Sequence, residues 1–542
     1  MPSELFLETI EIDVEIAEAL PIDANATCYP LPSLVGTGKY QKVELEAVLL
    51  ENAFLRVTVI PALGGRIWSI FHKGQNREAI PQSGQLKLST GGPRGVWLDA
   101  GIQFWPGEDM ARNSLAPVEF DLREAEGEDD PATVLLFDLI PGLGLSYHAS
   151  ISLKPDQAQV EIAVRLLNRN LTALPYTCSF QSSSEFVRLY PEGELFEHED
   201  NGVFRRFAKG DALAPRQTDS FSLSVVPSFA TGIDHHQSGL TLTIGDKELT
   251  LETSLIRPKS RMFLGQPDGQ TLEATFDLYP ENPQVVTYES LGGKPIGVVV
   301  RDLSGNDLLT WSKVETGKIK LLGSATGTLL LSPPADSKES KYNLAFKGTS
   351  TEADLNGVFS VPALASPARI VVAMRKLAAG DPNTALALLT DAVNTNAEDP
   401  LTWWLVCVAK RHANIGSEEN AELLNAHYLS PMEPVLRAES FLASPISNEQ
   451  ARVLEPLKSC PESAIEIACL YVEAGLFADS VRLIGELRRQ MDLPMLKLLE
   501  AYCYKVGSRM DVQAAELMTG IKRSDLTPWR RIEIEACKRL YA

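Results

Sequence analysis

The feature that most constrains the fold is a change of hydrophobic period near Ser366. From about residue 8 to about residue 360, short runs of alternating apolar and polar residues, such as "QVEIAVRLLNRN" and "QTLEATFDLYP", are separated by Gly, Pro, Asn and Asp. Such runs, with no helical pattern between them, are typical of antiparallel sandwiches or barrels. After Ser366 apolar residues recur at three- and four-residue spacing, as in "PARIVVAMRKLAAGDPNTALALL", which indicates helices. The sequence therefore predicts a multidomain chain, β and then α.

A chain of 542 residues is too long for one hydrophobic core, because domains average roughly 150 residues. We predict a large β-sandwich over residues 1–290, a small β-unit with a connection over residues 291–365, and helical repeats over residues 366–542. The segment before Ser366 is polar and rich in Ser, Lys and Gly. We interpret it as the connection between the β and α parts.

The helical part resembles a degenerate array of tetratricopeptide repeats. The stretches "AGDPNTALALL" and "AGLFADSVRLI" place a glycine, a small residue and a leucine at the same offsets. These residues are Gly380, Ala385 and Leu388 in the first stretch, and Gly475, Ser480 and Leu483 in the second. Each helix pair must bury its apolar face on a neighbour, so the resemblance implies an α-solenoid. Such a solenoid would offer a surface to a protein partner.

The net charge of the chain indicates which ligands are expected. The chain has 71 acidic and 50 basic residues, a formal net charge of -21. Nucleic acid is disfavoured as a partner because phosphate binding needs a basic face. An acidic surface suits a neutral ligand such as a sugar. The first residues, "MPSELFLETIEIDVEIAEAL", lack the positive region of a signal peptide, and no run of eighteen apolar residues predicts a membrane span.

Cysteine usage and motifs give expectations about location and cofactors. The seven cysteines lie far apart, and none forms a C-x-x-C pair. We interpret them as buried free thiols in a reducing cytoplasm and expect no metal site. The phosphate-loop, zinc-protease, nucleophile-elbow and dinucleotide-binding motifs are absent from the sequence. Phosphate and nicotinamide cofactors are therefore not expected, and we predict no cofactor.

Two adjacent glycines interrupt a pair of strand-like runs in "FLRVTVIPALGGRIWSIF". Glycine inside a strand pattern marks a bulge or a close approach to the backbone, so Gly64 and Gly65 are interpreted as a constrained turn. Arg66 has two alternative roles. It would offer its planar fork of donors to a ligand, or it would pair with an acid such as Asp99 or Glu119 and brace the chain.

This stretch and the following "GGPRGVWLDAGIQFWPG" resemble a bacterial family of uncharacterised galactose-mutarotase-like domains fused to tetratricopeptide repeats. The resemblance implies a large antiparallel β-supersandwich whose concave face binds carbohydrate. The matching residues are Gly64, Gly65, Arg66, Arg94, Gly95, Trp97, Gly101, Ile102 and Phe104. Gln103 stands where the family usually carries Glu, and an amide cannot exchange a catalytic proton at a useful rate. A tryptophan-rich segment usual in the family is also missing.

The densest group of chemically useful residues is "DAGIQFWPGEDMARN". Trp105 offers a face on which a sugar stacks, and Glu108 and Asp109 are candidate catalytic carboxylates. Arg94, Trp97 and Gln103 are candidate substrate-binding residues. The alternative is a polar surface loop in which Trp105 packs on the rim of the sandwich.

Four further candidates lie later in the β part. Glu185 lies in a strand-like run, where a buried carboxylate needs a partner. Tyr190 matches a Tyr-Pro ending in the family, and His198 lies among acidic residues. His235 belongs to the only histidine pair, and the resemblance makes it a candidate general acid. Solvated loops are the alternative for the two histidines.

These residues lead to two functional hypotheses. The first is an enzyme acting at an anomeric centre by general acid/base catalysis, either a glycoside hydrolase or a sugar epimerase, with a sugar or oligosaccharide as substrate. Glu108 or Asp109 would act with Glu185 or His235. The second is a non-catalytic carbohydrate-binding scaffold whose helical repeats hold a protein partner. Gln103 favours the second hypothesis, and the Gly-Gly-Arg and Arg-Gly-x-Trp motifs fit both.

Overall fold

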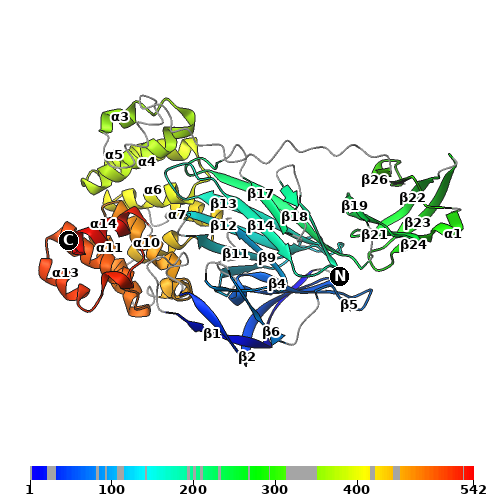
Figure 1. Ribbon diagram of the computed structural model, residues 1–542. Helices are drawn as coiled ribbons and strands as arrows, with labels where there is room; N and C mark the ends of the chain where they lie inside the picture. The colour runs from blue at the N-terminus through cyan, green and yellow to red at the C-terminus, as the bar shows by residue number, and fades with distance from the viewer. Residues whose placement is uncertain are drawn as a thin grey trace.

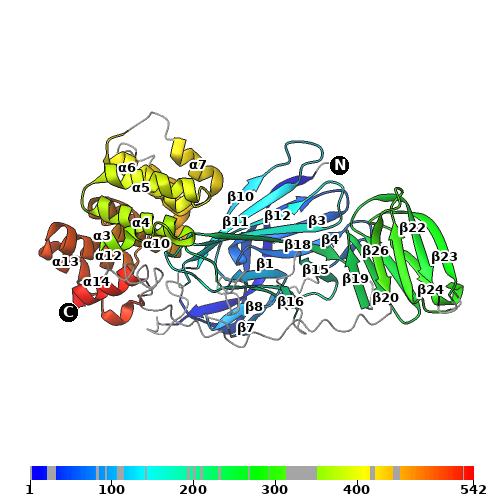
Figure 2. The ribbon, with the colours of Figure 1, turned by 90° about the horizontal axis from the view of Figure 1, so that it is seen from above.

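The computed structural model consists of a β-rich N-terminal part and a helical C-terminal part, as the change of period predicts. It describes residues 3–20, 32–80, 85–91, 94–106, 115–140, 143–191, 196–198, 203–207, 212–229, 233–266, 269–291, 293–312, 351–415, 421–443, 452–528 and 530–541. The helices lie at one end of the molecule, a β-sandwich in the middle and a second β-unit at the other end (Figure 1; Figure 2 from above).

The sandwich packs a ten-stranded sheet on a six-stranded sheet, counted over the described residues. The ten-stranded sheet runs in the order β16 (Phe196–His198), β17 (Val203–Phe207), β14 (Thr177–Ser182), β9 (Ile102–Pro106), β4 (Arg66–His72), β3 (Leu55–Ile60), β2 (Leu34–Glu51), β1 (Glu4–Ala19) and β6 (Gln85–Leu86), with β5 (Arg77–Glu78) on β4. The six-stranded sheet runs in the order β10 (Glu119–Arg123), β11 (Ala132–Ile140), β12 (Leu145–Leu153), β13 (Val160–Asn168), β18 (Thr218–Pro227) and β15 (Val187–Pro191).

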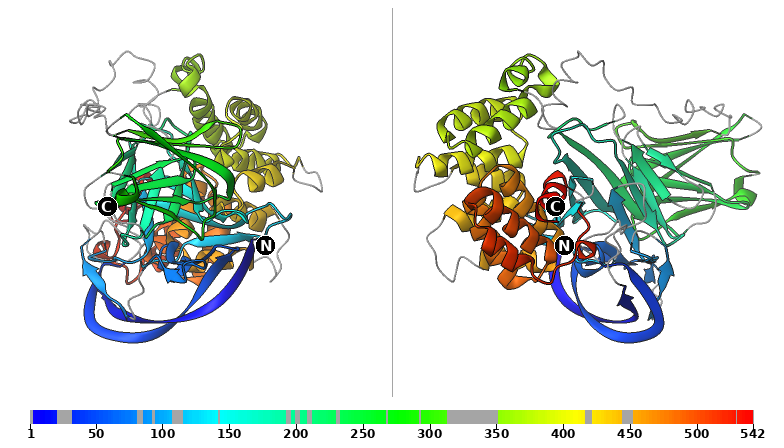
Figure 3. Two further views of the ribbon diagram at one scale, coloured as in Figure 1. Left: turned by 90° about the vertical axis from the view of Figure 1, so that its right-hand side faces the viewer. Right: turned by 60° about the vertical axis from the view of Figure 1, so that its left-hand side comes forward.

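Alternation along the strands builds the core between the sheets. In β13 the side chains of Val160, Ile162, Val164 and Leu166 are buried, and they pack with core residues of both sheets. The pairings are antiparallel except for a short parallel contact of β1 with β6. β1 and β2 extend as a long curved hairpin on one side of the sandwich (Figure 3).

The outer surface of the ten-stranded sheet carries a small apolar cluster over β2, β3 and β4. Two short strands, β7 (Leu88–Thr90) and β8 (Val96–Leu98), pair with each other beside this surface. Leu86, Leu88 and Leu98 pack there against Ile60 and Trp68. Over these strands the sheet is therefore covered by the chain itself.

The second β-unit has its own core, and the boundary predicted at residue 290 falls inside it. Its first sheet runs β19 (Ile233–Gln237), β20 (Leu240–Ile244), β21 (Glu248–Thr253) and β24 (Gln284–Thr287), with α1 (Tyr288–Leu291) following. Its second runs β23 (Thr271–Leu278), β22 (Arg257–Gly265), β25 (Gly297–Arg301) and β26 (Asp307–Ser312). Because β22 pairs with β25, the strands on both sides of residue 290 share one unit.

The C-terminal helices form consecutive hairpins. They are α3 (Glu352–Asn356), α4 (Pro362–Ala378), α5 (Pro382–Thr395), α6 (Pro400–His412), α7 (Ala421–Leu429), α8 (Pro434–Ala443), α10 (Pro461–Glu473), α11 (Phe477–Gln490), α12 (Pro494–Cys503), α13 (Asp511–Met518) and α14 (Arg531–Tyr541). Gly380 has φ +77° at the turn between α4 and α5, and Asp381 and Asp399 cap the next two helices. The helices expected from the apolar spacing on both sides of Gly380 are confirmed.

The helices cover the outer face of the six-stranded sheet. Ser430 lies 2.9 Å from Nε2 of His148 on β12, and the Arg165 guanidinium on β13 donates to the carbonyls of Glu398 and Leu429. Among the described residues no helix is both long and apolar enough to cross a membrane. The six described cysteines are free thiols, and all but Cys460 are buried.

Candidate functional site

The Gly64–Gly65 turn joins β3 to β4 and faces the space between the sheets. Gly64 has φ +77° and Gly65 has φ +70°. A Cβ atom on Gly65 would lie 2.7 Å from Cδ1 of Leu136 and 2.9 Å from Cγ2 of Val118, both closer than van der Waals contact allows. The expected constrained turn is therefore confirmed, and its reason is the close approach of this backbone to the opposite sheet.

Arg66, which follows the turn, is buried with only 2% of its surface exposed. Its Nε donates to the carbonyl of Leu63 (2.9 Å), and its Nη1 donates to those of Leu98 (2.9 Å) and Ala100 (2.6 Å). Its Nη2 lies 3.4 Å from Oε1 of Gln103. Burial lowers the pKa of Arg66 to about 9, so it stays charged at neutral pH. These contacts are those of the bracing alternative, made mostly through backbone carbonyls.

The Arg-Gly-x-Trp motif, residues 94–97, is also held by hydrogen bonds from a buried arginine to backbone carbonyls. Arg94 is buried, and its Nε donates to the carbonyl of Pro32 (3.1 Å) and its Nη1 to that of Leu115 (3.4 Å). Gly101 has φ +72°, and a Cβ atom there would lie 2.3 Å from the carbonyl oxygen of Ile67. Trp97 is also buried. Packing therefore explains several of the residues on which the family resemblance rests.

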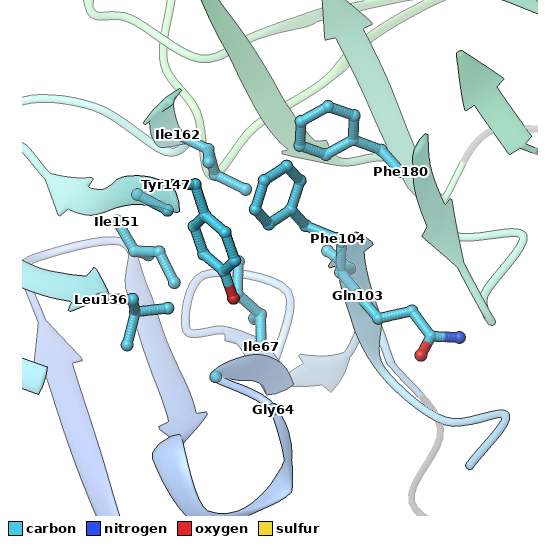
Figure 4. Close-up of a pocket in the computed structure, with 12 residues that line it drawn as sticks. Gly64, Ile67, Gln103, Phe104, Leu136, Tyr147, Ile151, Ile162 and Phe180 are labelled. Atoms are coloured by element: carbon cyan, nitrogen blue, oxygen red, sulfur yellow. The ribbon is translucent and has the colours of Figure 1, made fainter. Parts of the chain in front are cut away.

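Polar side chains gather on the outer face of the ten-stranded sheet, over β9 and β14. Along these strands Ile102, Phe104, Cys178 and Phe180 point into the core. The alternate residues point outward, and we call them the polar strip: Gln103, Trp105, Thr177, Ser179 and Gln181. Figure 4 shows Gln103 directed away from the core side chains Phe104 and Phe180. The two strands place Ser179 beside Trp105 and Gln181 beside Gln103.

The polar strip is largely buried. Gln103 is 5% exposed, Trp105 6% and Ser179 1%. Nε2 of Gln103 lies 3.5 Å from Oε1 of Gln181. In the part of the chain that the structure describes, Nε1 of Trp105 and Oγ1 of Thr177 are buried without a hydrogen-bond partner. A buried donor left unpaired costs about 1–3 kcal/mol, so the strip has capacity for an acceptor that is not among the described residues.

A small cavity lies on the other side of β9, between the two sheets (Figure 4). Its volume is about 20 Å³, and its lining includes Gly64, Ile67, Tyr147 and Phe180. A water molecule needs at least about 10–15 Å³, whereas small-molecule sites span roughly 300–1,000 Å³. This cavity belongs to the core and is too small to bind a sugar.

The candidate catalytic residues are scattered over the β part. Glu108 and Asp109 lie outside the described residues, shortly after Pro106 at the end of β9. Glu185 is exposed in a turn before β15, so the expectation that it lies buried in a strand is wrong. His235 is half-buried on β19, in the second β-unit. No cluster of metal-ligating side chains occurs in the described ranges.

Tyr190 and the histidine pair mark a contact between the sandwich and the second β-unit. The Tyr190 ring on β15 stacks on His236, with centroids 3.6 Å apart and an interplanar angle of 11°. Burial and then the charge of His235 lower the pKa of His236 to about 4. His198 is in the short strand β16, and its side chain lies outside the described atoms. The described contacts of Tyr190, which was a candidate substrate-binding residue, are thus with other residues of the protein.

Thr177, Ser179 and Gln181 are not among the site residues expected from the sequence. The stretch "TCSFQS" carries the signal, because its polar residues alternate with Cys178 and Phe180. Alternation alone predicts a strand with one solvated face. Only the pairing of β14 with β9 shows that these side chains extend the surface begun by Gln103 and Trp105.

Comparison with known proteins gives a partial family match. Residues 24–204 match the family described as "Domain of unknown function (DUF5107)". A crystal structure of a TPR-domain containing protein from Parabacteroides distasonis aligns over 95% of this chain and 96% of its own, with 12% identity and a TM-score of 0.32. A galactose mutarotase-like protein from Lactobacillus casei aligns over 44% and 86%, with 12% identity and a TM-score of 0.19. Superpositions this poor do not assign a fold or a function.

Proposed function

We propose that the protein binds a neutral carbohydrate on the polar strip. The observation that carries this proposal is the buried indole Nε1 of Trp105, which has no acceptor among the described residues. It lies beside amide and hydroxyl groups on a face of the sheet where a core would need apolar side chains. A sugar hydroxyl accepts from an indole N–H and donates to an amide oxygen.

The chemistry of the strip favours a neutral ligand over a charged one. Its side chains are two amides, two hydroxyls and an indole, and the adjoining Arg66 already donates to three carbonyls. Apolar ring faces and hydrogen-bonding groups together match a molecule whose C–H and O–H surfaces alternate.

We further propose that the sandwich is of the galactose-mutarotase type and that the helices are tetratricopeptide-like repeats. Two antiparallel sheets of unequal size and a series of helical hairpins support this proposal, together with the motifs of the sequence resemblance. The helices would then present their free surfaces to a protein partner.

Fluorescence titration with a panel of neutral oligosaccharides tests the binding proposal. A docked sugar changes the surroundings of Trp105, so saturation should change the emission, and Trp105→Ala should abolish that change. Trp311→Ala is the matched control, because Trp311 lies on β26 in the second β-unit. An equal response in the Trp105→Ala and wild-type proteins contradicts the proposal.

Catalysis at an anomeric centre is the second candidate function. It is favoured by the positions of Glu108 and Asp109, which follow the strand that carries Trp105. If either acts as a general acid or base, Glu108→Gln or Asp109→Asn should lower turnover of a bound oligosaccharide by about 10²–10⁴-fold while binding persists. Turnover that survives both substitutions would exclude these two residues.

A further inference from the structure

We infer that the helical domain positions the polar strip through Arg169, which donates hydrogen bonds to two buried carboxylates of the helices, Glu433 and Glu466. Arg169 follows β13, and the segment 169–176 leads from it into β14. β14 carries three of the five residues of the strip. The inference rests on the proposed function in one respect, since it gives that binding surface a positioning residue on the opposite side of the sandwich.

The first step is the contact itself. Nη1 and Nη2 of Arg169 donate to the two carboxylate oxygens of Glu433, at 2.7 and 2.9 Å, and Nε donates to Glu466 at 2.6 Å. Nη2 of Arg530 forms an ion pair with the other oxygen of Glu466, at 2.7 Å. The side chains of Arg169, Glu433 and Glu466 are at most 3% exposed. Burial lowers the pKa of Arg169, but the two carboxylates outweigh burial and raise it above its ordinary value.

The second step is the segment between Arg169 and β14. Leu171 is buried in the apolar core of the helices. On the opposite side of the same segment, Nδ2 of Asn168 donates to the carbonyls of Thr172 and Leu213, and the backbones of Leu174 and Leu213 exchange hydrogen bonds. The helices and the sandwich therefore both hold the chain immediately before β14.

A second ion pair joins the same two domains and serves as a comparison for Arg169. Arg437 of α8 pairs with Glu119 on β10, the edge strand of the six-stranded sheet. The chain joins Glu119 to β9 through residues 107–118, and β14 comes much later in the sequence. If both ion pairs only held the helices on the sandwich, then loss of Arg169 and loss of Arg437 would change amide exchange in β14 to a similar extent. If Arg169 positions β14, only its loss should change the dynamics of residues 177–182.

The experiment compares Arg169→Met with Arg437→Met in the full-length protein. Hydrogen exchange of the backbone amides of 177–182 reports on β14, and the ¹⁹F resonance of Trp105 in fluorotryptophan-labelled protein reports on the strip. We expect amide exchange at 177–182 about tenfold faster in Arg169→Met than in the wild type and in Arg437→Met, together with a shifted Trp105 resonance in Arg169→Met. Arg169→Lys, which keeps the charge but loses the fork, should give an intermediate result and serves if Arg169→Met does not fold.

Equal exchange at 177–182 and an unshifted Trp105 resonance in folded Arg169 variants would overturn the inference. Equally faster amide exchange at 177–182 in Arg437→Met would also overturn it, because it would show a general loosening of the domain contact. Neither measurement uses a sugar. Failure to bind any oligosaccharide would therefore refute the proposed function and leave this result to be judged separately.

Discussion

The outer faces of the two sheets of the sandwich differ in how their buried polar side chains are paired. On the six-stranded sheet the helices cover the strands, and charged groups there meet opposite charges, as in Arg169 with Glu433 and Arg437 with Glu119. On the ten-stranded sheet, over β9 and β14, the side chains are neutral and polar, and Trp105 Nε1 has no described acceptor. The first face is joined to the helices by ion pairs, whereas the second carries neutral groups with hydrogen-bonding capacity.

The difference shows how to separate a docking face from a binding face. Buried ion pairs repay their desolvation only in good geometry, so they fix one arrangement of two domains. Neutral donors and acceptors cost less to desolvate and can exchange water for a ligand. Four substitutions test this comparison, in order of decreasing expected effect.

Gly65→Val should disrupt both faces, because it forces the two sheets apart. The new side chain would collide with Leu136 of the opposite sheet and with Val118, just before β10, at a residue whose φ is +70°. Overpacking and backbone strain together should lower the free energy of unfolding by at least about 3 kcal/mol. Chemical denaturation measures the loss, and a variant that unfolds like the wild type would refute the constrained-turn interpretation.

Gly91→Val separates strain from collision in this prediction. Gly91 has φ +125°, yet a Cβ atom there would meet nothing within 4 Å. We expect a loss of only about 1–2 kcal/mol, from strain alone. Equal losses at both positions would mean that the approach of Gly65 to the opposite sheet is unimportant.

Arg66→Lys should weaken the ten-stranded face through folding and not first through binding. Lysine keeps the charge but cannot serve the carbonyls of Leu63, Leu98 and Ala100 together, so we expect a loss of about 2–3 kcal/mol. Arg56→Lys, at an exposed pair with Glu51, should cost less than about 0.5 kcal/mol. Unchanged stability with weakened sugar binding would favour the ligand role instead.

Sequence reasoning succeeded where a rule is local. The Gly64–Gly65 turn and the helices on both sides of Gly380 follow from patterns that neighbouring residues specify. It could not assign Arg66 to bracing or binding, because that depends on Leu98 and Ala100, which are far away in the sequence. The ion pair of the buried Glu433 with Arg169 could not be predicted either, because the two residues are far apart in the sequence.

His148→Gln should remove part of the acid sensitivity of the six-stranded face. His148 is half-buried beside the helices, and desolvation, then the charges of Arg165 and Arg169, lower its pKa from 6.5 to about 3. Between these values the unfolded chain binds a proton that the folded protein excludes, so stability falls as the pH falls, by up to about 1.4 kcal/mol per pH unit.

Denaturation midpoints of wild type and His148→Gln between pH 7 and pH 4 measure this contribution. The slope should be shallower in the variant. His235→Gln, in the second β-unit, controls for the removal of an imidazole elsewhere. Identical slopes in the wild type and His148→Gln would show that this histidine does not report on the contact between the domains.

Gln103→Glu has the smallest expected effect on stability and bears most directly on the polar strip. The substitution keeps the shape of the side chain and restores the residue usual in the family that the sequence resembles. A carboxylate at a 5%-exposed position is costly unless it is paired, but the guanidinium of Arg66 lies 3.4 Å from Oε1 of Gln103. We therefore expect a change below about 1 kcal/mol at pH 7 and retained sugar binding. Gln181→Glu is the control, since Gln181 is half-buried and its described contact is with Gln103, so its carboxylate would keep part of its hydration. If Gln103→Glu costs clearly more than Gln181→Glu, then Arg66 does not compensate charge on the strip. A gain of turnover in Gln103→Glu alone would show that the strip is an active-site face whose acid this chain has replaced with an amide.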